Sequence, residues 1–187
     1  MTTPDLSGPP QVVARRLLGC RLWTDIDGRT EIILTEVEAY GGHDDPASHA
    51  YRGRTARNGS MFEPAGTLYV YRSYGIHWCA NVATGPSGQG QAVLLRGGLV
   101  VDGEEMIRER RGRADHLTDG PGKLTEALGI TGGHDGTNVA DGPVRIEGGD
   151  YPVDAADIHT ATRVGITKEA SRLWRFVLDI GGSEPGG

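Results

Sequence analysis

The segment Arg29–Tyr40 constrains the fold more than any other part of the chain, because its sequence suits one long β-strand. It follows Asp27-Gly28, a dipeptide that favours a tight turn, so we expect a hairpin whose first strand spans 21–25. A regular strand would separate the side chains into two faces, with Ile33, Thr35, Val37 and Ala39 on one and Glu36, Glu38 and Tyr40 on the other. A face that ends in two acids and a tyrosine should lie at a surface or in a cleft.

A second hairpin is expected in a tyrosine-rich stretch, with strands at 67–71 and 76–83. The turn between them contains Tyr74. A large aromatic ring at the tip of a turn has no core to fill, so Tyr74 should protrude from the molecule. Tyr69 and Tyr71 share one strand face, and one of the two could simply belong to the core.

The remaining elements follow from hydrophobic periodicity and from helix-end signals. Helices are expected at 10–18, 102–111 and 121–128, and further strands at 92–96, 144–147 and 173–180. Asp102 should cap the second helix, and Leu94 and Arg96 should share one face of their strand. The basic residues of 108–113 interleave with glutamates, which is typical of a solvated helix face. The polar segment 41–65 is long for a passive connection, which favours a functional loop.

With 187 residues the chain is long enough to bury a core and short enough to form a single domain. The expected elements predict an α+β fold, a curved and mostly antiparallel sheet with peripheral helices and a protruding β-hairpin. This domain should span 9–180. Because both ends of the chain are polar, we expect a disordered N-terminus at 1–8 and a flexible tail at 181–187.

Composition argues against several classes of protein. No stretch of 18 apolar residues is present, so no membrane span and no membrane partner are expected. The polar start MTTPDLSGPP lacks an apolar signal region, which favours a cytoplasmic location, with nucleoid association if the source is bacterial. Two cysteines are too few for a disulfide framework and should be buried thiols. A metal site could be imagined at His43, Asp44, Asp45 and His49, but the spacing of these residues fits no compact ligand set. We therefore expect no metal and no cofactor.

The net charge of −6 argues at first against a nucleic-acid partner, but the charge is unevenly distributed. Residues 46–100 contain five arginines and a single acid, Glu63, for a net charge of +4, and the rest of the chain carries −10. A local cationic strip matters more for phosphate contacts than the total charge does. We therefore expect nucleic-acid binding that is modest and sensitive to salt.

Glu38 and Tyr40 lie two residues apart, so their side chains should point to the same side of the strand. A carboxylate beside an aromatic platform suits an enzyme that attacks the sugar carbon of a base held outside a duplex. The protruding hairpin would supply a wedge for the gap that the displaced base leaves. No lysine lies in 35–96, which favours water as the nucleophile over an amine that would form a Schiff base.

Several stretches match one known family and occur in its order. They are TEVEAY at 35–40 with His49 nine residues later, ARNGSMFEPAGTLYVYRSYGIHWCANVA at 56–83, AVLLRG at 92–97, GPGKLTEALGI at 120–130 and RVGI at 163–166. Together they are far more specific than a single short motif, and they cover most of the chain. On these residues the chain resembles the alkyladenine (3-methyladenine) DNA glycosylase family.

The resemblance implies a monofunctional enzyme that flips a damaged purine out of double-stranded DNA and cleaves its N-glycosidic bond with water. By position in the family pattern, Glu38 would be the general base, and Tyr74 would enter the minor groove in place of the flipped nucleotide. The residues around the base would be Tyr40, His49 and Tyr71 as stacking walls, Asn81 as the residue that rejects the guanine amino group, and Leu94 and Arg96 as supports of the nucleotide and the acid.

Other interpretations of the same residues stay open. Asn81 could be a core amide, and His49 could be an ordinary loop histidine. Arg96 could be a structural ion-pair partner of Glu36 or Glu38. The chain could also be an inert module that binds lesions, against which an intact Glu38 argues. A hydrolase of free modified nucleosides is a third possibility, against which the wedge and the cationic strip argue. We expect a monomer.

Overall fold

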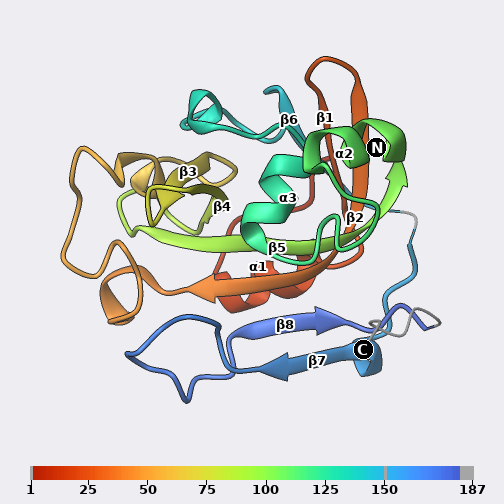
Figure 1. Ribbon diagram of the computed structural model, residues 1–187. Helices are drawn as coiled ribbons and strands as arrows, with labels where there is room; N and C mark the ends of the chain where they lie inside the picture. Colours follow the sequence, from red (N-terminus) through yellow and green to blue (C-terminus); the bar gives the residue numbers. More distant parts are fainter. Residues whose placement is uncertain (1, 150, 182–187) are drawn as a thin grey trace.

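The computed structural model describes residues 2–149 and 151–181, in which strands outnumber helices (Figure 1). The helices are α1 (Pro10–Leu17), α2 (Glu104–Arg111) and α3 (Pro121–Ala127). The strands are β1 (Arg21–Asp25), β2 (Arg29–Tyr40), β3 (Leu68–Ser73), β4 (His77–Thr84), β5 (Gln91–Asp102), β6 (Val144–Glu147), β7 (Ile158–Ala161) and β8 (Arg175–Leu178). The first two strands have the bounds that the sequence predicts.

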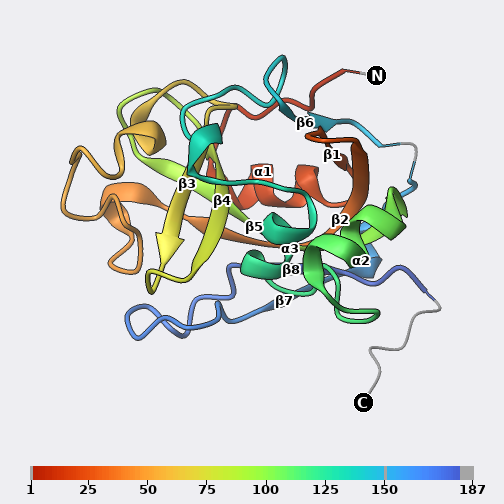
Figure 2. The ribbon, with the colours of Figure 1, turned by 45° about the horizontal axis from the view of Figure 1, so that its top comes forward.

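These strands form one antiparallel sheet in the order β3-β4-β5-β2-β1-β6, with β8 and then β7 added at β2. One edge of β2 pairs with β5. The other edge pairs with β1 along 29–33 and then with β8 along 36–38. Figure 2 shows the curled sheet with α1 against it and the β3–β4 hairpin extending from one side. The predicted α+β fold with a curved, mostly antiparallel sheet is confirmed.

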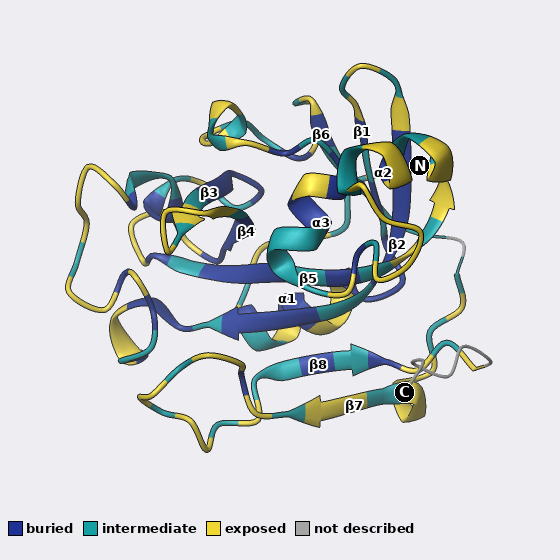
Figure 3. Ribbon diagram, viewed as in Figure 1, coloured by how far each residue is buried: buried dark blue, intermediate teal, exposed yellow. Residues whose placement is uncertain are grey.

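The sheet separates two apolar clusters. On one face α1 and α3 contribute Val13, Leu17 and Leu124 to the main core. On the other face a smaller cluster forms under the loop 41–65, and it includes Phe62 and Tyr69. Figure 3 shows that β2 and the first half of β5 are mostly buried, whereas the loop mixes exposed and buried residues. The sheet therefore offers a rigid platform beneath whatever the loop encloses.

Of the three register shifts between β2 and β5, two are bulges near the middle of β2. Thr35 is an extra residue on β2, and Arg96 is an extra residue on β5, because the register advances by two residues on one strand and one on the other. The first bulge reverses the alternation, so Leu34 rather than Ile33 shares the main core with Val37. The prediction that Ile33, Thr35 and Val37 share one face is wrong, because Ile33 and Thr35 do not lie on the face of Val37. The prediction assumed unbroken alternation along the strand.

The end of β5 also differs from the sequence prediction. The strand continues to Asp102 instead of ending at Arg96, because Asp102 pairs with Glu31 of β2. Gly103 is the N-cap of α2, with φ +70°, and no side chain caps the helix. The predicted cap by Asp102 is therefore wrong.

Two further features depart from expectation. Arg110 of α2 is not part of a solvated face, because its guanidinium donates to the main-chain carbonyl of Ala127 at 3.0 Å and ties α2 to α3. The strand β7, with the sequence IHTA, lacks the apolar alternation that would have indicated it. Its partner β8 is shorter than expected, and Phe176 and Leu178 lie in the main core.

The N-terminal segment contacts the domain in the part that the structure describes. Leu6 lies in the main core, and Arg16 of α1 donates to the Asp5 carboxylate at 2.9 Å. Met1 and the predicted tail from residue 182 onward lie outside the described residues. Both cysteines, Cys20 and Cys79, are buried free thiols, as predicted. In 2–149 and 151–181, none of the helices has the length and apolar character needed to span a membrane.

Candidate active site

Four strands bring one row of side chains together on the face of the sheet opposite the main core. The register pairs Tyr69 of β3 with Asn81 of β4. It also pairs Asn81 with Leu94 of β5, and Leu94 with Glu38 of β2. Directly paired residues of antiparallel strands point to the same side of a sheet. These four buried side chains therefore form a continuous floor across the strands.

Glu38 has no exposed surface, and its two carboxylate oxygens have different partners. Oε2 accepts a hydrogen bond from the Tyr40 hydroxyl at 2.8 Å. Oε1 accepts one from the main-chain amide of Val164 at 2.8 Å and lies 3.4 Å from a guanidinium nitrogen of Arg96. A carboxylate has roughly four lone-pair sites in all. Oε2 therefore keeps one position that a water molecule could use as a hydrogen-bond donor.

Arg96 lies between two acids. Its Nε donates to Glu36 at 2.8 Å, while its Nη1 approaches Glu38. Glu36 also accepts a hydrogen bond from Arg175 at 3.2 Å. Burial works against the charge of the Arg96 guanidinium, but Glu38 and Glu36 outweigh that effect and raise the pKa of Arg96 above its usual range. Two acids and two arginines thus balance one another, and Arg96 forms ion pairs with both Glu36 and Glu38, an alternative that the sequence left open.

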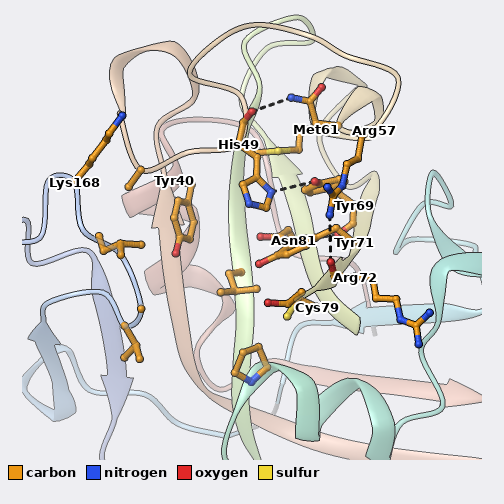
Figure 4. Close-up of a pocket in the computed structure, with 18 of the residues that line it drawn as sticks. Tyr40, His49, Arg57, Met61, Tyr69, Tyr71, Arg72, Cys79, Asn81 and Lys168 are labelled. Atoms are coloured by element: carbon orange, nitrogen blue, oxygen red, sulfur yellow. Dashed lines mark hydrogen bonds between the residues drawn. The ribbon is translucent and has the colours of Figure 1, made fainter. Parts of the chain in front are cut away.

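Aromatic rings form the walls above this floor. His49 and Tyr71 meet edge to face with ring centroids 4.5 Å apart, and Tyr71 stacks on Tyr69 at 5.5 Å. Nδ1 of His49 lies 3.1 Å from the Tyr69 hydroxyl, which fixes the imidazole ring. In Figure 4, Tyr40 stands on the opposite side of the pocket from His49 and Tyr71.

The walls carry no charge at neutral pH. Burial raises the pKa of Tyr69 to about 12 and also raises the pKa of Tyr71. The pKa of Tyr40 is raised by burial and further by the neighbouring Glu38. Partial burial of the imidazole lowers the pKa of His49 below 6.5, and the positive charge of Arg57 lowers it further. A base that enters the pocket therefore meets neutral phenols and a neutral imidazole.

The floor and walls belong to a cavity of about 850 Å³. Its lining comes from the sheet, from the loop 41–65 and from the segment that follows β7 (Figure 4). Pockets of about 300–1,000 Å³ hold small organic ligands. Glu38 itself does not line the cavity. It lies directly beneath three residues that do, namely Tyr40, Arg96 and Val164.

A buried ion pair supports the Tyr40 wall from behind. Arg163 and Asp45 have no exposed side-chain surface and are joined by two hydrogen bonds, one of them 2.9 Å long. The Arg163 guanidinium lies 4.7 Å from the centre of the Tyr40 ring. Burial opposes the charge of Asp45, yet the hydrogen bonds from Arg163 lower its pKa. Since Val164 follows Arg163 in the chain, the same ion pair holds the amide that binds Glu38.

The β3–β4 hairpin places Tyr74 at the rim of the cavity. Tyr74 and Gly75 both have positive φ, +50° and +70°, and the Ile76 amide donates to the carbonyl of Ser73 at 3.0 Å to close the turn. Tyr74 is 91% exposed and Ile76 is 67% exposed. The prediction that Tyr74 protrudes is confirmed, and the tip presents two large apolar side chains to solvent.

Basic side chains surround the mouth of the cavity, where Arg52, Arg57, Arg72 and Lys168 are all exposed. Arg57 donates to the main-chain carbonyl of Arg72 at 3.2 Å, which joins the loop to the hairpin. The stretch 35–96 contains no lysine, as noted above. The cavity nevertheless has one at its mouth, because Lys168 comes from a later part of the chain. In Figure 4, Lys168 lies at the edge of the pocket, beyond Tyr40.

Every site residue predicted from the sequence lies at this one cavity. Seven line it, and Glu38 lies beneath it. Sequence reasoning missed Asp45, Arg163 and Val164 as parts of the site, although the stretch RVGI at 163–166 was one of the family-like segments. Across the described ranges, no three His, Cys, Asp or Glu side chains gather in a way that could hold a metal ion.

The chain belongs to the methylpurine-DNA glycosylase family, whose model matches residues 5–180. Its relatives include three proteins named "Putative 3-methyladenine DNA glycosylase". The protein of Nocardia farcinica is 50% identical over 188 residues, which cover 95% of this chain and 87% of that protein. The protein of Methanoculleus marisnigri is 48% identical over 170 residues, with coverage of 89% and 88%. The protein of Mycobacterium tuberculosis is 45% identical over 192 residues, with coverage of 95% and 89%.

Proposed function

We propose that this protein flips alkylated or deaminated purines out of duplex DNA and hydrolyses their N-glycosidic bonds with water activated by Glu38. The product would be an intact abasic site, the first intermediate of base excision repair. One observation carries the proposal most: a buried carboxylate with a free acceptor position lies under a cavity with aromatic walls. Family membership supports the reaction class.

Stacking would hold the flipped base between Tyr40 on one side and His49 with Tyr71 on the other. A purine alkylated at N3 or N7 is electron-poor and often cationic, so electron-rich rings favour it over a normal base. Each stacked base contributes roughly 1–3 kcal/mol. The lowered pKa of His49 supports this role, because a protonated imidazole would repel a cationic purine.

Glu38 would act on the sugar side of the base. As the N-glycosidic bond breaks, positive charge develops on the sugar, and the nearby carboxylate stabilises it. Glu38 accepts a proton from a water molecule at its free Oε2 position, the water oxygen bonds to the sugar carbon, and the bonding electrons leave with the purine. Arg96 would hold the nucleotide and the carboxylate in place, with Leu94 packed beside it on the floor.

Asn81 would restrict which purines fit. Its side-chain amide donates to the main-chain carbonyl of Tyr69 at 3.3 Å, and the residue is buried, so it cannot swing aside for a larger base. A fixed amide on the floor would meet an exocyclic amino group at the purine 2 position. This supports a pocket that rejects normal guanine.

Tyr74 would fill the gap in the duplex, and the basic residues of the rim would contact the phosphates. Flipping a base costs a few kcal/mol of stacking and pairing, and an inserted ring offsets part of that cost. We expect Tyr74→Ala to slow excision from duplex DNA more than from single strands, with little change in the stability of the free protein. Equal slowing of both substrates, or loss of folding, would remove Tyr74 from this role.

Water as the nucleophile separates this proposal from a strand-cutting enzyme. The exposed Lys168 at the rim is the amine best placed to compete. The experiment incubates the protein with duplex oligonucleotides that contain 3-methyladenine, 7-methylguanine, hypoxanthine or ethenoadenine. Free base and an alkali-sensitive abasic site should appear, without a strand break before alkali. A covalent adduct trapped by borohydride in the wild type but not in Lys168→Gln would overturn the monofunctional reaction, and binding without excision of any lesion would favour the inert module.

A further inference from the structure

Glu36 is an acid near the site that the proposed reaction does not use. It does not line the cavity, and its side chain is 21% exposed. A single oxygen, Oε1, accepts hydrogen bonds from both Arg96 and Arg175. Glu36 therefore does not contact the base pocket and can act on the reaction only through its partners.

The bulge in β5 sets up a competition between Glu36 and Glu38 for one guanidinium. Arg96 is the extra residue of that bulge. It gives its shorter contact, 2.8 Å through Nε, to Glu36 and a longer one, 3.4 Å through Nη1, to Glu38. A guanidinium prefers to bind one carboxylate with two parallel hydrogen bonds when nothing else holds it. Such a bidentate pair would occupy the acceptor position that Glu38 needs for water.

We propose that Glu36 is a positioning residue, which holds Arg96 away from a bidentate pair with Glu38 and thereby keeps Glu38 able to take a proton from water. This inference rests on the proposed function of Glu38 and adds a second requirement to it. Glu36 acts through the hydrogen bonds that it accepts from two guanidinium groups, and its negative charge helps to balance Arg96 and Arg175.

The surroundings of Glu38 support an effect of that charge. The ionisable groups around it come from six parts of the fold, namely Glu36 and Tyr40 of β2, Tyr71 of β3, Cys79 of β4, Arg96 of β5, Arg175 of β8, and Arg163 behind Tyr40. Among these, the tyrosines and the thiol are neutral at pH 7. Removal of Glu36 would therefore take away the carboxylate that pairs with Arg175 and would leave Arg96 to Glu38.

The test is the pH dependence of single-turnover excision, with enzyme in excess over a duplex that contains hypoxanthine. For Glu36→Gln we expect the plateau rate to fall on the order of tenfold, because a bidentate Arg96 would occupy the acceptor position that water needs on Glu38. The acidic limb of the profile should move to lower pH, and affinity for lesion DNA should stay within about threefold. Glu36→Asp keeps the charge and should restore the position of the acidic limb.

Glu31→Gln is the matched control, since Glu31 is another glutamate of β2 that pairs with two arginines but lies at the far end of the strand. It should change neither the plateau rate nor the acidic limb. An unchanged profile in Glu36→Gln would overturn the inference, as would a loss explained fully by a smaller folded fraction. If Glu36→Gln does not fold, Glu36→Asp becomes the test. A shift of its acidic limb together with a change of its plateau rate, both relative to the wild type, would then overturn the inference as well. Full activity of Glu38→Gln would instead refute the proposed function itself.

Discussion

The two ends of β2 carry buried glutamates in opposite circumstances. Glu31 is 3% exposed, and each of its oxygens pairs with an arginine, Oε1 with Arg21 and Oε2 with Arg29 at 2.7 Å. Glu38 is fully buried, but its closest donors are a phenol and a main-chain amide, and its arginine lies at 3.4 Å. The strand, the residue type and the burial are alike, so the partners make the difference.

The comparison teaches what keeps a buried carboxylate available for chemistry. Burial opposes the charge of Glu31, but hydrogen bonds from Arg29 and Arg21 outweigh it and lower its pKa, so this acid stays charged and serves the sheet. Neutral donors hold Glu38 in place while leaving one acceptor position open. A carboxylate saturated by arginines thus serves the sheet, whereas one held mainly by neutral donors keeps a lone-pair site for a further donor.

Asp45 extends this comparison into the site itself. Asp45 lies behind Tyr40, and both of its carboxylate oxygens accept hydrogen bonds from Arg163, much as the oxygens of Glu31 pair with arginines. We therefore assign Asp45 a structural role. Asp45→Asn leaves the Arg163 charge buried without its partner, which should lower the free energy of unfolding by about 3–5 kcal/mol. Urea denaturation measures this change.

The exposed pair of Asp119 with Lys123 offers the matched control. Asp119→Asn should cost less than about 1 kcal/mol, because surface ion pairs contribute little. Equal losses in the two variants would contradict the structural role given to the buried pair.

Acid should destabilise the protein through the same arginine-bound acids. The pKa values of Asp45 and Glu31 are lower in the folded state than their ordinary values of 3.8 and 4.5. Their contribution to stability is therefore fully present above about pH 4.5 and is lost as the pH falls through the folded values. Denaturation between pH 6 and pH 2.5 should show this decline, and it should be shallower in Glu31→Gln. A pH-independent free energy of unfolding below pH 4.5 would contradict the assignment.

Tyr40→Phe sharpens the comparison on the side of Glu38. The variant keeps a stacking ring but removes the neutral donor to Oε2. A hydrogen bond to a charged group is worth roughly 1.5–3 kcal/mol. Part of this remains if water replaces the phenol, so we expect excision to fall about tenfold with lesion binding nearly unchanged. Tyr69→Phe loses a hydroxyl that contacts His49 instead and should slow excision less. The reverse order would show that Glu38 does not depend on its phenol.

Much of this arrangement could be predicted from local sequence. The hairpin at Tyr74 follows from its turn residues, and β2 follows from its composition and the Asp27-Gly28 turn. The bulges at Thr35 and Arg96 could not be predicted, since a bulge is a property of two paired strands. The contact of Asp45 with Arg163 joins residues 118 positions apart, and neither residue stands in a pattern that indicates the other.

The central claim is that Glu38 performs chemistry while Glu31 serves structure, and one paired measurement tests it. Glu38→Gln and Glu31→Gln are compared for single-turnover excision, lesion-DNA binding and urea unfolding. We expect Glu38→Gln to slow excision by about 10²–10⁴-fold with binding within several-fold, as loss of a general base would. Glu31→Gln should excise at the wild-type rate while losing about 1–3 kcal/mol of stability. Near-normal excision by Glu38→Gln, or an equal loss of excision in both variants, would contradict the claim.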